Sequence, residues 1–144
     1  MKPDFNYTSV PHNYIHCFNN NCTHATECLR HQVALHVPDT VGIIHTVSPV
    51  YKIPDTTECR YFKKDELKLF ASGMDHLFDK IPYNDAVIIQ KQIQGCFEKS
   101  TYYRCKRKER LITPKEQELI RQVFLDHGIK EEPQYDEYIK QYEW

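Results

Sequence analysis

The chain has 144 residues, enough for one domain with a substantial hydrophobic core. Its formal net charge of −1 argues against a protein that attracts nucleic acid over its whole surface. The sequence has no apolar run as long as a membrane span, and its first residues lack the pattern of a signal peptide. We therefore expect a cytoplasmic protein without membrane contact, folded as a single domain over residues 1–144.

The first 60 residues contain most of the cysteines and histidines but few regular hydrophobic patterns. A short helical turn is expected near His31–His36. Residues 41–54 are rich in β-branched side chains and interrupted by prolines, which predicts one or two short extended segments. We expect residues 1–60 to form an irregular Cys/His-rich lobe and residues 61–144 to form a helical part.

The clearest predicted helix covers residues 113–128. Thr113 is an N-cap residue, Pro114 suits the first helical position, and Glu116 completes a capping box with Thr113. Gly128 can adopt the left-handed conformation that often ends a helix. These local signals predict both ends of the element.

Three further segments carry apolar residues at helical spacing. They are residues 64–82, residues 84–99 with Asn84 as a cap, and residues 133–144. The first two are joined by a short proline-containing connector, which predicts an antiparallel helical hairpin. The expected fold class is therefore mainly α with minor β, in which one or two short strands belong to the N-terminal lobe.

The stretch "CFNNNCTHATEC", residues 17–28, places three cysteines close together. Four residues separate Cys17 from Cys22, five separate Cys22 from Cys28, and Cys59 follows thirty residues later. Loops of this length let thiolates turn back toward one point, and a distant fourth ligand ties the loop to the rest of the fold. We expect these four cysteines to bind a metal that fixes the lobe.

Several alternatives remain open for this stretch. Zinc is the default metal for thiolate ligands, an iron–sulfur cluster also uses four cysteines, and His16, His24 or His31 can replace one cysteine in a zinc site. The cysteines can instead be buried as small apolar residues without any metal. Disulfides are disfavoured because nothing in the sequence indicates export. A fully ligated metal is structural, whereas an open position allows a bound water to act as a nucleophile.

The segment "STYYRCKRKER", residues 100–110, interleaves tyrosines with cations. Cations attract phosphates and tyrosine rings stack on bases, so this composition predicts contact with RNA or DNA. The residues concerned are Tyr102, Tyr103, Arg104, Lys106, Arg107, Lys108 and Arg110. The alternative is a solvated segment that pairs with the acidic C-terminal residues. Within it Cys105 is expected to be an ordinary thiol, which nearby cations would make reactive only if it were exposed.

Sequence signatures of common enzymes are absent. The chain has no phosphate-binding glycine loop, no HExxH motif and no GxSxG motif. We therefore expect a non-enzymatic protein with a structural thiolate metal site that binds nucleic acid. The alternatives are an adaptor that binds proteins through its acidic, tyrosine-rich C-terminal surface, and a small metalloenzyme with an open metal position.

Four motifs carry a resemblance to a known family: the cysteine stretch that ends in "CLR", "ECRYF", "YYRCKRKERLITPKEQELI" and "YDEYIKQYEW". Together they resemble a family of uncharacterised small intracellular proteins from gut Bacteroidales, along most of the chain. The resemblance implies a bacterial intracellular protein. It implies no activity, ligand or partner, because the function of that family is unknown.

Overall fold

The structure is a computed structural model that describes residues 5–52 and 59–144. The chain divides into two compact units. The N-terminal unit consists of Met1–Leu67 and Tyr142–Trp144, and the C-terminal unit consists of Lys68–Gln141. The single-domain organisation stays a prediction. None of the helices in the described residues combines the length and the apolar character needed to span a membrane.

The N-terminal unit is built from short elements. They are the 3-10 turns η1 (Tyr7–Ser9) and η2 (Ala25–Glu27), the helix α1 (Leu29–Ala34), and the strands β1 (Ile15–His16) and β2 (His45–Thr46). β1 and β2 pair in parallel, with Ile15 opposite His45. Within the expected extended segment over residues 41–54, the described residues form one strand of two residues, β2. Residues 53 and 54 of that segment lie outside the described ranges.

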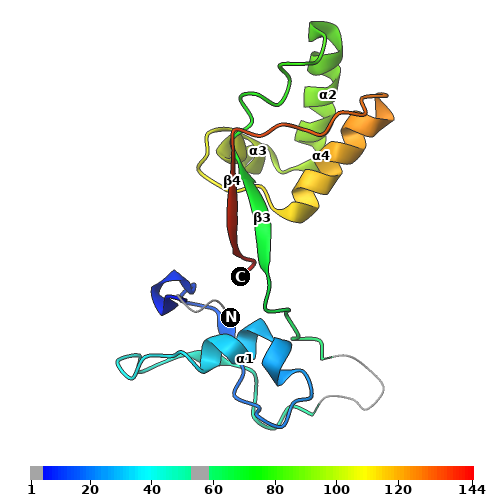
Figure 1. Ribbon diagram of the computed structural model, residues 1–144. Helices are drawn as coiled ribbons and strands as arrows, with labels where there is room; N and C mark the ends of the chain where they lie inside the picture. Colours follow the sequence, from blue (N-terminus) through cyan, green and yellow to red (C-terminus); the bar gives the residue numbers. More distant parts are fainter. Residues whose placement is uncertain (1–4, 53–58) are drawn as a thin grey trace. The chain divides into compact units, whose positions relative to one another are not determined.

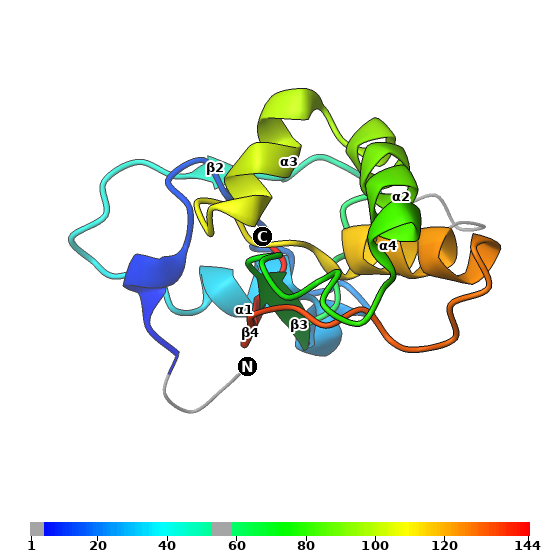
Figure 2. The same cartoon turned by 90° about the horizontal axis from the view of Figure 1, so that it is seen from above.

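The C-terminal unit combines three helices with a strand pair. The helices are α2 (Tyr83–Cys96), α3 (Lys99–Lys106) and α4 (Pro114–Asp126), and the paired strands are β3 (Leu67–Ser72) and β4 (Glu137–Tyr142), apart from their outermost residues. α2 packs against both α3 and α4 (Figure 1, Figure 2). A continuous core joins the three helices and β3, and it includes the buried side chains of Ile89, Ile93, Ile112 and Ile120.

Helix α4 confirms the clearest prediction. The Thr113 hydroxyl accepts a hydrogen bond from the Glu116 amide, and the Glu116 carboxylate accepts one from the Thr113 amide at 2.8 Å. Gly128 has a φ of 76° just beyond the helix. The helix predicted over 84–99 is also present as α2, although Pro82 rather than Asn84 is its N-cap. Both helices are encoded by local sequence signals.

The predicted mainly α fold class is wrong, because the structure is mixed, with 35% helix and 14% strand. Residues 64–82 do not form a helix: β3 covers Leu67–Ser72, and turns follow it. The predicted helical hairpin is therefore also wrong. Residues 133–144 do not form a helix either, and β4 covers Glu137–Tyr142 within them. In both segments, pairing between strands outweighs an apolar spacing that also fits a helix.

Gly73 explains why β3 ends where it does. Its φ is 78°, a conformation that side chains with a Cβ rarely adopt, and a Cβ there would overlap the Asp136 carboxylate. This carboxylate accepts hydrogen bonds from the amides of Asp75 and His76 at 3.0 and 3.2 Å. The turn after β3 is thus fastened to the start of β4, within the C-terminal unit.

We predict opposite outcomes for two glycine-to-alanine substitutions. Gly73→Ala should lower the free energy of unfolding by more than about 2 kcal/mol, because it adds backbone strain and a steric overlap. Gly95→Ala, in α2 with open space around its Cβ position, should raise it by about 0.5 kcal/mol. Urea unfolding followed by circular dichroism measures both changes. Equal effects from the two substitutions would contradict the role assigned to Gly73.

Candidate metal centre

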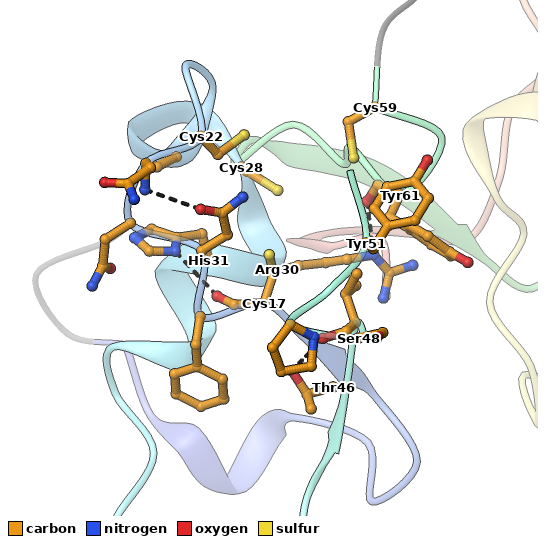
Figure 3. A pocket seen from close by; sticks show the side chains of 17 residues that line it. Cys17, Cys22, Cys28, Arg30, His31, Thr46, Ser48, Tyr51, Cys59 and Tyr61 are labelled. Carbon is orange, nitrogen blue, oxygen red and sulfur yellow. Dashed lines mark hydrogen bonds between the residues drawn. The ribbon is translucent and has the colours of Figure 1, made fainter. Parts of the chain in front are cut away.

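A cavity of about 420 Å³ lies within the N-terminal unit. All four cysteines that the sequence singles out line it: Cys17, Cys22, Cys28 and Cys59. Figure 3 shows their sulfur atoms standing around this space and pointing into it. The structure therefore brings together three cysteines of one loop and a fourth that follows much later in the chain.

The loop that carries Cys17 and Cys22 is shaped by its own backbone contacts. The Cys17 amide donates to the carbonyl of Arg30 at 3.2 Å, which attaches the start of the loop to α1. The Asn19 side chain accepts a hydrogen bond from the Asn21 amide at 3.0 Å, and the Asn19 carbonyl accepts one from the Cys22 amide at 3.4 Å. Asparagine favours such tight turns because its side chain bonds to the backbone two residues later.

Cys59 reaches the cavity because its segment is attached beside Cys28. Cys28 immediately precedes α1 and forms an isolated antiparallel bridge with Lys64. The Leu29 amide donates to the Lys63 carbonyl at 2.6 Å, which extends this attachment. The carbonyl of Cys59 accepts a hydrogen bond from the Phe62 amide at 2.8 Å in a turn that leads to the bridge. Two distant parts of the chain thus meet at one wall of the cavity.

Arg30 forms another part of the wall and joins three segments. Its Nε donates to the carbonyl of Tyr61 at 2.9 Å and its Nη1 donates to the carbonyl of Ile15 at 2.9 Å. Its guanidinium also lies 5.1 Å from the centre of the Tyr14 ring. Tyr61 packs edge-to-face on Tyr51, with ring centres 5.1 Å apart, and both rings line the cavity. The cavity therefore has a cationic and an aromatic side.

All six cysteines of the chain lie in the described ranges and none forms a disulfide. Among the described residues, no three His, Cys, Asp or Glu side chains form a group that could hold a metal ion as they stand. The four cysteines line one cavity without forming such a group. Metal binding at these residues stays a prediction at this point.

The three histidines considered as alternative ligands have different surroundings. Both ring nitrogens of His16 are used, since Nε2 lies 2.8 Å from the Tyr7 hydroxyl and Nδ1 lies 3.1 Å from the His45 carbonyl. His24 is exposed and packs on Phe62. His31 alone of the three lines the cavity, and its Nδ1 lies 3.1 Å from the carbonyl of Cys17.

The basic segment forms helix α3 and the turn after it, in the C-terminal unit. Tyr102 is buried in the core of that unit, whereas Tyr103 and Arg104 are exposed. Three of its cations form ion pairs with acidic residues of the same unit: Arg107 with Glu109, Lys108 with Asp136 and Glu137, and Arg110 with Glu116. Part of the positive charge is therefore neutralised internally.

Comparison with family models places the whole chain, residues 1–144, in one family, described as "Family of unknown function (DUF6078)". The chain belongs to this family. Searches among curated proteins and among solved structures gave no match. Membership of DUF6078 confirms the resemblance to a family of unknown function, and it transfers no activity or ligand. The function must be argued from the residues themselves.

Sequence reasoning missed the residues that complete the cavity beside the cysteines. They include Arg30, Tyr51, Tyr61 and residues 46–49. No local signal could have found them, because Arg30 contacts carbonyls 15 and 31 residues away in the chain. The pairing of β1 with β2, the bridge beside Cys28 and the hydrogen bonds of Arg30 bring these segments together.

We predict that the two cysteines of the C-terminal unit differ in reactivity. Cys105 is buried, and burial raises the pKa of its thiol despite the opposing effect of Arg110. A raised pKa leaves less of the reactive thiolate near neutral pH. Cys96, by contrast, is exposed. In the folded protein at pH 8, iodoacetamide should modify Cys96 at least about tenfold faster than Cys105. Peptide mass spectrometry measures both rates. Equal rates would contradict this burial of Cys105.

Proposed function

We propose that the N-terminal unit binds a metal centre through the thiolates of Cys17, Cys22, Cys28 and Cys59, and that this centre holds the unit in its folded form. The observation that supports the proposal is the shared cavity into which all four side chains point (Figure 3). Thiolates from one loop and one distant segment are the usual ligands of structural metal centres.

The small hydrophobic core of the N-terminal unit gives this proposal a physical reason. Its buried apolar cluster comprises Tyr14, Leu29, Val33 and Tyr142. The C-terminal unit buries twelve residues in its own cluster. A unit with two-residue strands, one six-residue helix and a small core buries little apolar surface to offset the entropy lost on folding. Small domains of this kind commonly gain the missing stability from a structural metal.

The charge of the cavity wall also supports a thiolate centre. Four thiolates around a divalent ion leave a net charge of about −2, which is costly to keep in a partly enclosed site. The Arg30 guanidinium lines the same cavity and is held in place by two backbone carbonyls. Its positive charge would offset part of the negative charge of such a centre.

The wider setting is part of the proposal. A metal centre made of cysteines suits a reducing compartment, where thiols stay open, so we place the protein in the cytoplasm of a bacterium and give it a non-enzymatic role. An origin in gut Bacteroidales stays a prediction of the sequence resemblance, since the family match gives no source.

Binding of RNA or DNA also stays a prediction. Tyr102 is buried and three of the seven named residues are cations in ion pairs, so such binding would depend mainly on Tyr103, Arg104 and Lys106. The protein adaptor and the metalloenzyme with an open position are likewise predictions of the sequence. The shared cavity that the four cysteines line supports the metal centre best.

We predict that Cys22→Ser lowers the amount of metal bound per chain by at least about tenfold, because it removes one thiolate ligand. The matched control is Cys96→Ser, since Cys96 is exposed and lies outside the N-terminal unit. The control should retain the metal content of the unmodified protein. Elemental analysis of the purified proteins measures both. Equal metal content in Cys22→Ser and the unmodified chain would contradict the ligand set.

A further inference from the structure

We infer that the metal centre and the segment Tyr142–Trp144 stabilise each other within the N-terminal unit, through Tyr14 and Arg30. This inference rests on the proposed function, because it concerns metal binding at the same four cysteines. It goes beyond that proposal by naming a distant segment that controls how tightly the metal is held. Tyr142–Trp144 belongs to the N-terminal unit, although the whole C-terminal unit separates it from Leu67 in the chain.

The segment completes the small buried cluster of the N-terminal unit. Tyr142 is buried in the same cluster as Tyr14 and Leu29, and Trp144 packs against that cluster. The ring of Trp144 meets the Tyr14 ring edge-to-face with centres 5.2 Å apart, and its centre lies 5.5 Å from that of the Tyr142 ring. Leu29 directly follows Cys28 in the chain, so the cluster adjoins one of the proposed ligands. Loss of the Trp144 ring would loosen this cluster.

Tyr14 connects the segment to the wall of the cavity. Its side chain is buried, and the Arg30 guanidinium lies 5.1 Å from the centre of its ring. A guanidinium is attracted to the face of an aromatic ring, and more strongly where water is excluded. The Tyr14 ring thus contacts both Trp144 and Arg30. A change in the packing of Trp144 would therefore reach Arg30 through one side chain.

Arg30 in turn holds both parts of the chain that supply the cysteines. Its Nη1 donates to the carbonyl of Ile15, two residues before Cys17, and its own carbonyl accepts a hydrogen bond from the Cys17 amide. Its Nε donates to the carbonyl of Tyr61, two residues after Cys59. These hydrogen bonds keep the cysteine loop and the distant segment together. A shift of Arg30 would therefore disturb ligands that must converge on one metal.

The effect must act in both directions. If the docked Trp144 ring strengthens metal binding by some factor, the bound metal strengthens the docking of Trp144 by the same factor, because binding free energies are linked reciprocally. Trp144 is the only tryptophan of the chain, so its fluorescence reports on this segment alone. Metal affinity and tryptophan emission therefore measure the same relation from its two ends.

The first test measures the zinc affinity of the full chain by competition with a chelator, with zinc as the probe. Trp144→Ala should bind zinc at least about fivefold more weakly than the unmodified chain. Trp144→Phe keeps a ring that can contact Tyr14, so its affinity should stay within about twofold. The matched control is Tyr83→Ala, which removes an exposed ring from α2 in the C-terminal unit and should leave the affinity unchanged.

The second test examines the connection through Arg30. In the double variant of Trp144→Ala and Arg30→Ala, the loss of zinc affinity should be clearly smaller than the product of the two separate losses, because both substitutions act on the same contacts. Separate losses that multiply would overturn this connection. Removal of zinc by the chelator should also shift the Trp144 emission to longer wavelengths, as the ring gains contact with water. An unchanged emission would overturn the inference.

The outcomes separate this inference from the proposed function. Zinc that is lost in Cys22→Ser but bound equally by Trp144→Ala and the unmodified chain would overturn the inference while supporting the thiolate centre. Equal losses of affinity in Trp144→Phe and Trp144→Ala would overturn the ring contact with Tyr14 as its cause. An unmodified chain that binds no zinc or other metal would overturn both proposals.

Discussion

The fold of the N-terminal unit depends on holding the segment that carries Cys59 beside the loop that carries Cys17, Cys22 and Cys28. The chain between Cys28 and Cys59 contains thirty residues, with β2 as its only strand in the described ranges. Closing a loop of this length costs conformational entropy. On a simple chain-entropy model, a cross-link between its ends restricts the unfolded chain and stabilises the folded unit by about 3–4 kcal/mol. The backbone bridge beside Cys28 and the bonds of Arg30 provide further attachment.

The C-terminal unit achieves its stability by different means. It has a continuous apolar core, a capping box at the start of α4, and a turn in which the Asp136 carboxylate accepts hydrogen bonds from two backbone amides. The turn after its basic helix α3 carries three cations, Arg107, Lys108 and Arg110, that form ion pairs with acidic residues of the same unit. We therefore expect the two units to respond differently to chelation, because only the N-terminal unit contains the proposed ligands.

The parts of the fold that could be predicted from the sequence are those encoded by neighbouring residues. Thr113, Pro114, Glu116 and Gly128 define the ends of α4 without reference to the rest of the chain. β3 and β4 could not be found in this way, because each gains its hydrogen bonds from a segment far away in sequence. Gly73 did carry a usable signal, since a glycine in the middle of a predicted helix weakens that prediction.

The candidate site shows the same division between local and distant information. The cysteines were identified from residue type and spacing, and the structure brings all four to one cavity. Arg30, Tyr51 and Tyr61 were not identified, because their places in the wall depend on contacts between segments. Residue chemistry thus indicated the proposed ligands, whereas the cavity that they line could be found only from the fold.

The most direct test of the central claim is X-ray absorption spectroscopy of the purified protein at the iron and zinc edges. The account predicts a metal whose nearest neighbours are sulfur atoms only, and iron atoms as next neighbours if the centre is a cluster. A metal surrounded by nitrogen or oxygen atoms, or no metal bound at all, would contradict the claim that Cys17, Cys22, Cys28 and Cys59 hold a common centre.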